Sequence, residues 1–253
     1  MKTAIVIPAR YRSSRLPGKV LLRETGKYLV QHVYERACQA KCANQVLVAT
    51  DDPRIAAAVE HFGGLVVMTR RDHATGSDRV AEVAQGLDAD IIVNLQSDEP
   101  LIDPATIDLL PRMLDRDPQA PIATLAVPIT NLDQWHDPNC VKVVCDAHGL
   151  ALYFSRSPIP FVRDGRPQFA AEPPRFLQHL GLYAYRREFL LRLAEMPPAP
   201  IEQLEKLEQL RVLAAGHRIA VGVARHATIG VDTRADYERF VEMYRRSRER
   251  KAA

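Results

Sequence analysis

The sequence contains no long apolar run and no signal-peptide pattern, so we expect neither a membrane span nor an exported protein. Its four cysteines are Cys38, Cys42, Cys140 and Cys145, and no two of them have the C-x-x-C spacing of a common zinc site. We expect these thiols to be reduced and mostly packed, which is typical of cytoplasmic proteins.

Two glycine-rich motifs that bind nucleotides are absent as well. The sequence has neither G-x-x-x-x-G-K-[ST] nor G-x-G-x-x-G, which excludes a P-loop and the common dinucleotide-binding fingerprint. A net charge of +3 over 253 residues is too small to indicate nucleic acid as the main partner. Any ligand site therefore has to be found from the arrangement of the polar residues.

Short apolar runs and helix-like segments alternate over the first half of the chain. Such alternation predicts an α/β fold with a mostly parallel, open sheet flanked by helices. Asp52 is placed as N-cap and Pro53 as the first residue of one helix, Gly63 as its stop, and Ser77 can cap the next helix. The predicted strands are 3–9, 45–50, 65–68 and 90–96, and the predicted helices are 28–40, 53–62, 77–87 and 104–114.

After residue 110 the pattern changes to a smaller, mixed α/β part. A hairpin is expected to turn at His148 and Gly149, and an amphipathic helix over 201–216 is expected to pack Leu204, Leu207 and Val212 inward. The remaining predicted elements are strands 121–129, 179–186 and 217–224, an irregular loop 158–174 and a closing helix from 232 to 246.

We find no repeat and no clean linker in the sequence, so we expect one continuous domain with soft boundaries. Residues 1–120 form the predicted nucleotide-binding core, 121–215 a second part, and 216–253 a return to the core sheet with a C-terminal helix. In open α/β sheets, ligands bind beyond the carboxyl ends of the strands. The segments that follow the four predicted strands are 10–19, 50–52, 69–77 and 97–99.

The loop after the first strand is strongly basic. Six cations, including Arg10, Arg15 and Lys19, precede the first carboxylate of the chain, Glu24. Because like charges repel one another, an ordered loop of this kind is typical of an anion site, and Gly18 allows the backbone to approach a ligand closely. On composition alone the loop is also compatible with a solvated surface, but its place at the end of a strand favours a polyphosphate site.

The segment IPARYRSSRLPGK (7–19) resembles the nucleotide-binding signature of the sugar-acid cytidylyltransferases. The resemblance runs in order and without large gaps from about residue 3 to about residue 240. Any one segment is weak support, whereas the ordered set is highly specific. The other matching segments are VATDD, MTRRDHATGSDRVAEV, VNLQSDEPLI, ALYFSRSPIP, HLGLYAYR, LEQLRVL and GVDT.

The resemblance implies a nucleotide-diphospho-sugar transferase type of fold. It also implies a reaction in which the anomeric hydroxyl of 3-deoxy-manno-octulosonate (Kdo) attacks the α-phosphorus of CTP and expels pyrophosphate. The product would be a CMP-activated sugar for lipopolysaccharide. Phosphoryl transfer of this kind depends on positioning and on neutralising oxygen charge, for which Mg²⁺ is the expected cofactor, with two ions in the full complex.

The resemblance also assigns residues to this chemistry. Arg10, Arg15 and Lys19 are expected to hold the triphosphate, and Lys19 to stabilise charge on the α-phosphate and the leaving group. Asp98 is the expected central magnesium ligand, and Asp232 the ligand of a second ion beside the acceptor sugar. Without the resemblance, each aspartate would be about as well explained as a helix cap.

The loop HATGS (73–77) is expected to read the cytosine base, because short hydroxyl and backbone groups can bond to its edge without bulk. Alone, these residues would be an ordinary surface histidine followed by turn and cap residues. The full set expected at the nucleotide is Ala9, Arg10, Arg15, Lys19, Thr50, Asp51, His73, Thr75, Gly76, Ser77 and Arg79.

Residues of the second half are expected to hold the sugar acid. An arginine suits a planar carboxylate, while Glu and Gln side chains can bond neighbouring hydroxyls. For Gln209 a solvated helix face is the competing explanation. The expected set is Gln96, Arg156, His179, Tyr183, Glu208 and Gln209.

The sequence departs from the family pattern at several points. Ser97 stands where glycine is usual, which would cost strain if the position requires a positive φ. Arg234 follows VDT where proline is common, and the lead-in HATIGVDT (226–233) also differs from the usual one.

Other functions remain compatible with parts of this pattern. They are a cytidylyltransferase for a sialic acid or for the 8-amino relative of Kdo, a non-catalytic nucleotide-binding homologue, and a sugar-transferring glycosyltransferase, whose usual D-x-D motif is replaced here by SDE. The family resemblance suggests a homodimer formed through the strands and loops after residue 120. No protein general base is assigned, because a metal ion at the acceptor hydroxyl would lower its pKa directly.

Overall fold

The computed structural model describes residues 1–13, 15–73, 75–224 and 230–252. Its internal contacts divide the chain into two compact units, Met1–Asp108 with Thr228–Ala253, and Leu109–Ala227. The sequence-based boundaries, after residues 120 and 215, differ from these bounds. The segment 216–253, which was predicted to return to the core, is divided between the units. Its residues up to 227 belong to the second unit, and the rest, with the C-terminal helix, belongs to the first.

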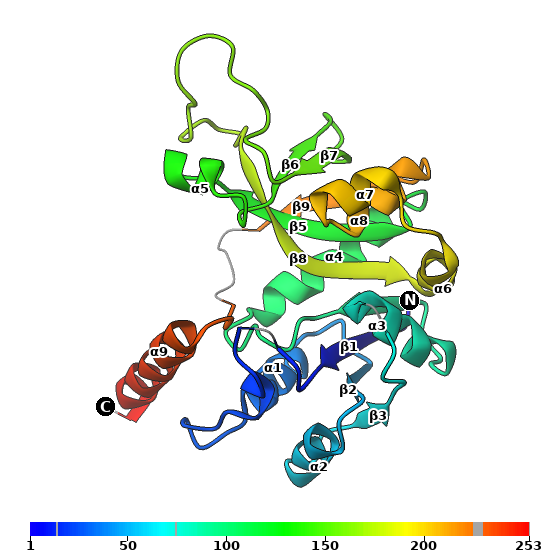
Figure 1. Ribbon diagram of the computed structural model, residues 1–253, viewed down its shortest axis with the longest axis vertical. Helices are drawn as coiled ribbons and strands as arrows, with labels where there is room; N and C mark the ends of the chain where they lie inside the picture. Colours follow the sequence, from blue (N-terminus) through cyan, green and yellow to red (C-terminus); the bar gives the residue numbers. More distant parts are fainter. Residues whose placement is uncertain (14, 74, 225–229, 253) are drawn as a thin grey trace. The chain divides into compact units, whose positions relative to one another are not determined.

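The first unit contains a parallel sheet with the strand order β3-β2-β1-β4. Strands β1, β2 and β3 are labelled in Figure 1. Every residue of β1 is buried, and Ile7 of β1 lies opposite Val48 of β2 in the parallel register. Continuous runs of apolar residues form such strands because both faces of the sheet are covered. The four strands confirm the predicted alternation, and their bounds are β1 (Thr3–Ala9), β2 (Gln45–Thr50), β3 (Val66–Met68) and β4 (Ile91–Asn94).

Helices α1, α2 and α3 pack against this sheet. Helix α2 begins as predicted, because the Oδ1 atom of Asp52 accepts a hydrogen bond from the backbone N–H of Arg54 at 3.0 Å and Pro53 occupies the first turn. Past its end, Gly63 has a φ of +78°, which terminates the helix. The bounds are α1 (Leu29–Ala37), α2 (Pro53–His61) and α3 (Gly76–Gln85), with a short 3-10 turn η1 (Lys19–Leu21) before α1.

The predicted cap of α3 is wrong by two residues. The N-cap is Thr75, whose hydroxyl accepts from the N–H of Asp78 at 3.1 Å, while the Asp78 carboxylate accepts from the N–H of Thr75 at 3.0 Å. This reciprocal pair is a capping box, which satisfies two backbone donors at once. Ser77 lies inside the first turn of the helix instead.

The C-terminal helix α9 (Arg234–Ala252) completes the first unit and confirms the predicted closing helix. Tyr237, Phe240 and Val241 form a buried cluster with Leu29 of α1 and with Val231. The burial of this apolar stripe explains how a helix that is otherwise rich in charged residues is held against the unit. Helix α4 (Pro104–Arg116) runs across the boundary between the units, which falls after Asp108.

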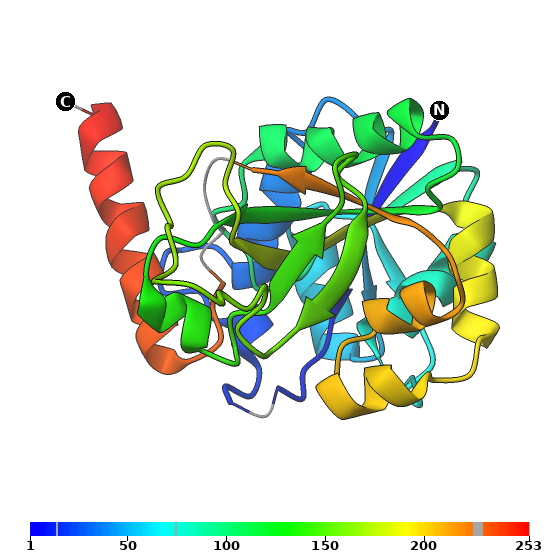
Figure 2. The same ribbon diagram turned by 90° about the horizontal axis from the view of Figure 1, so that it is seen from above.

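The second unit has a mixed sheet. Strand β8 (Leu177–Arg186) pairs antiparallel with β5 (Ile122–Pro128), which pairs parallel with β9 (Ile219–Val223). The predicted hairpin is present as β6 (Lys142–Cys145) and β7 (Ala151–Ser155), visible as two antiparallel arrows in Figure 2. Its turn contains Gly149 at φ +78°, a conformation that favours glycine.

One predicted helix of the second unit is in fact two. The segment 201–216 forms α7 (Pro200–Glu205) and α8 (Gln209–Ala214), separated at Lys206, which has a φ of +54°. Because the break rotates the helix faces, Leu207 and Val212 are buried but Leu204 is 83% exposed, contrary to expectation. The other helices of this unit are α5 (Leu132–His136) and α6 (Arg187–Glu195).

None of the four cysteines is part of a disulfide; Cys140 is buried, whereas Cys38 is exposed, contrary to the expectation of packed thiols. Among the described residues, every helix is too short or too polar to cross a lipid bilayer.

Candidate functional site

The loop after β1 places a buried lysine against two carboxylates. The Nζ atom of Lys19 lies 2.7 Å from an oxygen of Asp98 and 3.0 Å from one of Asp232, and it donates to the backbone carbonyl of Val231 at 2.9 Å. The Lys19 side chain is 9% exposed, against 27% for Asp98 and 40% for Asp232. Gly18, at φ +70°, turns the chain into η1 and so directs Lys19 inward.

Asp98 and Asp232 each make a further contact. Arg15 reaches Asp232 at 2.9 Å, and the N–H of Val231 donates to the carbonyl of Asp98 at 2.8 Å. The second contact ties the segment before α9 directly to the segment after β4. Residues that the sequence separates by 213 positions, Lys19 and Asp232, therefore share one site.

Neither aspartate is a helix cap. Helix α4 begins at Pro104, well beyond Asp98. At the start of α9, Thr233 and Asp236 exchange hydrogen bonds, with the hydroxyl of Thr233 accepting from the N–H of Asp236 at 3.2 Å. The alternative that Asp98 and Asp232 merely cap helices is therefore wrong.

The donor set of this site suits a hard divalent cation. Among the described residues there is no cluster of three or more metal-ligating side chains. A pair of carboxylates is nevertheless sufficient for Mg²⁺, because this ion takes one or two carboxylates from the protein and completes its shell with water and phosphate oxygens. Asp98 and Asp232 therefore fit the group that the sequence predicts.

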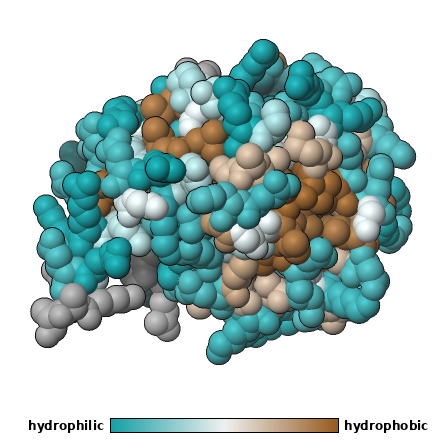
Figure 3. Space-filling model, turned by 90° about the horizontal axis from the view of Figure 1, so that it is seen from below, coloured by the Kyte–Doolittle hydropathy of each residue, from teal (hydrophilic) through white to brown (hydrophobic). Residues whose placement is uncertain are grey.

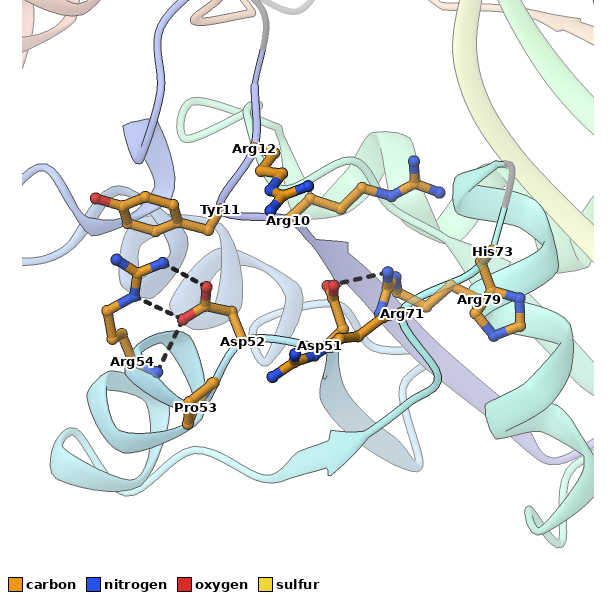
Figure 4. A pocket seen from close by; sticks show the side chains of 10 residues that line it. All are labelled: Arg10, Tyr11, Arg12, Asp51, Asp52, Pro53, Arg54, Arg71, His73 and Arg79. Carbon is orange, nitrogen blue, oxygen red and sulfur yellow. Dashed lines mark hydrogen bonds and ion pairs between the residues drawn. The ribbon is translucent and has the colours of Figure 1, made fainter.

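A cavity of about 550 Å³ lies beyond the carboxyl ends of β1 and β2 (Figure 4). Five arginines and one histidine line it, against two aspartates, so an anionic ligand is favoured there. The lining residues are Arg10, Tyr11, Arg12, Asp51, Asp52, Pro53, Arg54, Arg71, His73 and Arg79.

Arg79 braces this cavity from within the fold. Its side chain is 1% exposed, it donates to the Thr69 hydroxyl, and it forms an ion pair with Asp51 at 3.0 Å. Burial lowers the pKa of Arg79 from its ordinary value, while the Asp51 charge opposes that effect. Arg79 and Asp51 were both expected at the nucleotide, and both line the cavity, where they form an ion pair with each other.

The other residues expected at the nucleotide surround the same strand ends. Ala9 and Thr50 are buried partners in the register of β1 and β2, and the Thr50 hydroxyl accepts from the N–H of Asp52 at 3.2 Å. His73 lines the cavity and contacts the Glu82 carboxylate through Nε2. Of the predicted base-reading loop, Ala74 lies outside the described residues, and Thr75, Gly76 and Ser77 form the start of α3.

Six cavity residues were not assigned to the nucleotide by the sequence reasoning: Tyr11, Arg12, Asp52, Pro53, Arg54 and Arg71. Asp52 and Pro53 were predicted only as the start of a helix. Tyr11, Arg12, Asp52 and Arg71 lie inside quoted motifs, so their position at a strand end was an available signal. Arg54 had none, because nothing in the pattern of an amphipathic helix distinguishes a first-turn arginine that faces a cavity. Ser97 is 8% exposed and is not among the described residues with positive φ, so serine carries no backbone strain there.

In the second unit, Arg156 and a buried lysine hold the chain after β7. Arg156 donates from Nε to the carbonyl of Glu205 at 2.8 Å, and from NH1 to that of Pro138 at 2.9 Å. Lys142 is fully buried and donates from Nζ to the carbonyls of Arg156 and Asp137 at 2.6 and 2.9 Å. Burial lowers the pKa of Lys142, a residue that the sequence reasoning did not single out.

His179 and Tyr183 lie together on β8, with their ring centroids 5.4 Å apart. The Nε2 atom of His179 is 3.0 Å from the hydroxyl of Thr124. Burial lowers the pKa of His179 to about 3, so the imidazole is neutral at pH 7, and burial raises the pKa of Tyr183 well above its ordinary value.

Gln209 is buried, so the alternative of a solvated helix face is wrong. Its Nε2 atom has no hydrogen-bond partner among the described residues. An unsatisfied buried amide costs free energy, which a ligand atom or an ordered water that accepts its hydrogen bond would offset. The neighbouring Glu208 lies close enough for its charge to contribute to the raised pKa of Tyr183, after burial and the effect of Tyr185.

Five of the six residues expected at the sugar acid lie in one unit. Arg156, His179, Tyr183, Glu208 and Gln209 come from the second unit. Gln96 belongs to the first unit, where its Nε2 atom is 3.4 Å from the Oδ1 atom of Asn94.

Comparison with known proteins gives a consistent result. A family model described as cytidylyltransferase matches residues 4–219. A protein from Syntrophotalea carbinolica named 3-deoxy-manno-octulosonate cytidylyltransferase is 52% identical, covering 94% of this chain and 97% of its own length. A protein of the same name from Geobacter sulfurreducens is 51% identical over 96% of this chain and 99% of its own.

Solved structures agree with these relatives. The structure of CMP:2-keto-3-deoxy-manno-octonic acid synthetase complexed with CTP is similar with a TM-score of 0.90 and 47% identity, covering 98% of this chain and 100% of that one. A cytidylyltransferase from Leptospira borgpetersenii has a TM-score of 0.62 at 19% identity, covering 95% of this chain and 85% of that one, which supports the fold alone.

Proposed function

This chain belongs to the cytidylyltransferase family and is a nucleotidyltransferase, and from that premise we propose that it transfers the cytidylyl group of CTP to the anomeric hydroxyl of Kdo. The products are CMP-Kdo and pyrophosphate, and the pathway served is lipopolysaccharide biosynthesis. The bond that forms joins the sugar oxygen to the α-phosphorus, and the bond that breaks releases pyrophosphate.

The observation that carries the proposal is the contact of Lys19 with both Asp98 and Asp232 beside a cavity rich in arginine. Positive side chains from the loop after β1 suit the β- and γ-phosphates of a triphosphate. Arg10 and Arg15 hold these oxygens, and Lys19 stabilises the charge that develops on the α-phosphate and on the leaving pyrophosphate. His73, Thr75, Gly76 and Ser77 lie near the base, with Arg79 and Asp51 as the brace of the cavity.

Asp98 and Asp232 are the residues that would hold Mg²⁺. When bound, the metal supplies Lewis-acid stabilisation of phosphate oxygens and lowers the pKa of an oxygen ligand such as the acceptor hydroxyl. The protein's own contribution is to bring two distant carboxylates to one lysine.

The second unit supplies the groups for the sugar acid. Arg156 suits the planar carboxylate, and Glu208 and Gln209 can bond neighbouring hydroxyls. The unsatisfied Nε2 atom of Gln209 supports this assignment, because a sugar hydroxyl would provide the acceptor that the described residues lack. His179 and Tyr183 complete the proposed set of this unit, with His179 neutral at pH 7.

We also propose a homodimer and a cytoplasmic location. The second unit exposes several large apolar side chains, and Figure 3 shows apolar areas on the mainly hydrophilic surface. Contiguous apolar areas on a surface are typical of contacts between proteins, whereas single exposed apolar side chains are ordinary. The exposed apolar side chains of the second unit include Leu152 at 61%, Phe161 at 83% and Val223 at 50% exposure.

The test is a discontinuous assay of the purified protein with CTP, Mg²⁺ and a panel of sugar acids. We expect CMP-Kdo and pyrophosphate to form together, and turnover with Kdo to exceed that with a sialic acid or with the 8-amino relative. Faster turnover with another sugar acid would show that this acid, and not Kdo, is the acceptor. Binding of CTP without turnover of any acid would favour the non-catalytic alternative.

A further inference from the structure

A tyrosine of the basic loop is enclosed between a glycine and an arginine. Figure 4 shows the guanidinium of Arg54 beside the ring of Tyr11, and its central carbon lies 3.4 Å from the ring centroid. Gly18 is close by, since a Cβ atom built at that position would lie 3.1 Å from Cε2 of the Tyr11 ring. The stack therefore connects the first turn of α2 with the loop that carries Arg10, Arg15 and Lys19.

Arg54 is held in place by the residue that caps its helix. The two oxygens of Asp52 accept from Nε and NH2 of Arg54 at 2.9 and 2.6 Å, and Oδ1 also accepts from the Arg54 backbone N–H at 3.0 Å. This two-pronged pair fixes the plane of the guanidinium. Asp52 is 15% exposed and lies directly between β2 and α2, so its position, and with it that of Arg54, is fixed by these two elements.

The backbone of Tyr11 closes the loop at the same point. Its carbonyl accepts from the N–H groups of Ser13 and of Gly18, at 3.1 and 2.9 Å. Tyr11 thus contacts the end of the segment that precedes Lys19 in two ways. Its carbonyl accepts from Gly18, and its ring lies against the same glycine. Movement of the ring would disturb Gly18, and with it the residue that directs Lys19 inward.

We propose that Tyr11 and Arg54 are positioning residues for the triphosphate loop. The Asp52–Arg54–Tyr11 stack holds Arg10, Arg15 and Lys19 in place before the nucleotide binds. The role assigned to the stack rests on the proposed function, in which this loop takes the phosphates of CTP. Arg54 acts through its planar shape and its pair with Asp52 and not as one more positive charge at the cavity.

Charge and shape are separated by two substitutions at one position. Arg54→Lys keeps the positive charge but loses both the planar stack and the two-pronged pair, whereas Arg54→Met loses all three. Tyr11→Phe keeps the ring, and Tyr11→Leu removes it. Lys2→Met is a control for loss of a surface charge, since Lys2 precedes β1 and pairs with Asp88 away from the carboxyl ends of the strands.

The first readout is the steady-state rate at varied CTP with Kdo and Mg²⁺ saturating. We expect Arg54→Lys, Arg54→Met and Tyr11→Leu each to raise KM for CTP about two- to fivefold, as an exposed cation–π contact implies. The value of kcat should change little, because the triphosphate itself holds Arg10, Arg15 and Lys19 once CTP is bound. Tyr11→Phe and Lys2→Met should match the unchanged protein. The Tyr11→Leu/Arg54→Met double variant should be no worse than the poorer single variant, because both remove the same contact.

The second readout needs no activity. Limited trypsin digestion without nucleotide, with cleavage after Arg12 and Arg15 followed by mass spectrometry, should be severalfold faster in Arg54→Lys and Tyr11→Leu than in Tyr11→Phe. If Arg54→Lys matches the unchanged protein in both readouts, Arg54 acts by charge alone and the proposal is overturned. It is equally overturned if all variants match the unchanged protein. A protein that never turns over CTP would refute the proposed function, while the digestion would still decide whether the stack holds the loop.

Discussion

Lys19 and Asp98 form an ion pair of 2.7 Å, although 79 residues separate them in the chain. One comes from the loop after the first strand and the other from the loop after the fourth. Because β1 and β4 are parallel neighbours, their carboxyl ends lie side by side, and the two loops meet. In this arrangement the lysine lies against both carboxylates that are proposed to hold a metal.

The two aspartates are the first test of that assignment. Asp98→Asn and Asp232→Asn should each lower the rate of CMP-Kdo formation by about a hundredfold or more, because a neutral amide is a poor ligand for Mg²⁺. Pyrophosphate release measures the rate, and circular dichroism checks the fold. Asp88→Asn, an exposed aspartate that pairs with Lys2, is the matched control and should keep full activity. Near-normal release by both site variants would show that the metal assignment is wrong.

Removing Lys19 should expose the repulsion within the acidic pair. Lys19→Met should lower the free energy of unfolding by about 1–3 kcal/mol, less than for a fully buried pair because both aspartates are partly solvated. Mg²⁺ should then raise the melting temperature of this variant more than that of the unchanged protein.

The same variant should lose activity through kcat, since Lys19 is proposed to act on the transition state. Lys27→Met, which breaks a surface pair with Glu35, is the control for loss of a lysine. An unchanged kcat/KM in Lys19→Met would remove Lys19 from the mechanism.

Gln209 offers a test in which stability and activity move in different directions. Gln209→Leu removes a buried amide that has no partner within the described part of the chain, so the free energy of unfolding should stay the same or rise by up to about 1 kcal/mol. The KM for Kdo should rise about tenfold, while the KM for CTP stays constant. Gln203→Leu, on the exposed face of α7, should leave both constants unchanged. A stable variant with an unaltered KM for Kdo would place the sugar elsewhere.

His32 predicts a loss of stability in mild acid. It is buried, with its Nε2 atom 2.7 Å from the Thr25 hydroxyl and its ring against Phe240 and Tyr244, and burial lowers its pKa to about 4. The unfolded chain takes up a proton near the ordinary value of 6.5, whereas the folded chain does not. Stability is therefore complete above pH 6.5 and falls as the pH drops toward 4, by about 2 kcal/mol at pH 5 for a group with these values.

Urea unfolding at pH 7 and pH 5 measures this difference. His32→Gln should remove about 2 kcal/mol of the difference between pH 7 and pH 5, whatever it does to the stability at pH 7, and leave the similar contribution of buried His179, whose pKa is lowered to about 3. His148→Gln, in the exposed turn of the β6–β7 hairpin, should keep the dependence of the unchanged protein. An equal slope in all three proteins would show that His32 does not carry the effect.

Local patterns in the sequence determined the elements of the first unit and the place of its site. The apolar runs of β1, β2 and β4 were sufficient to predict buried strands, and Asp52 with Pro53 was sufficient to predict the start of α2, because these features depend on neighbours a few residues away. The family motifs added the roles of Lys19, Asp98 and Asp232. Local signals were weaker where either of two nearby residues could cap the helix, as with Thr75 and Ser77.

Only the tertiary structure decided which of these side chains meet. The contact of Lys19 with both aspartates, the break of the predicted helix at Lys206 and the stack of Arg54 on Tyr11 all depend on groups brought together by the packing of distant segments. A helix pattern places Arg54 on a first turn but contains no information about the ring that faces it. Pattern and spacing report local preferences, whereas pairing between distant residues is settled by strand order and burial.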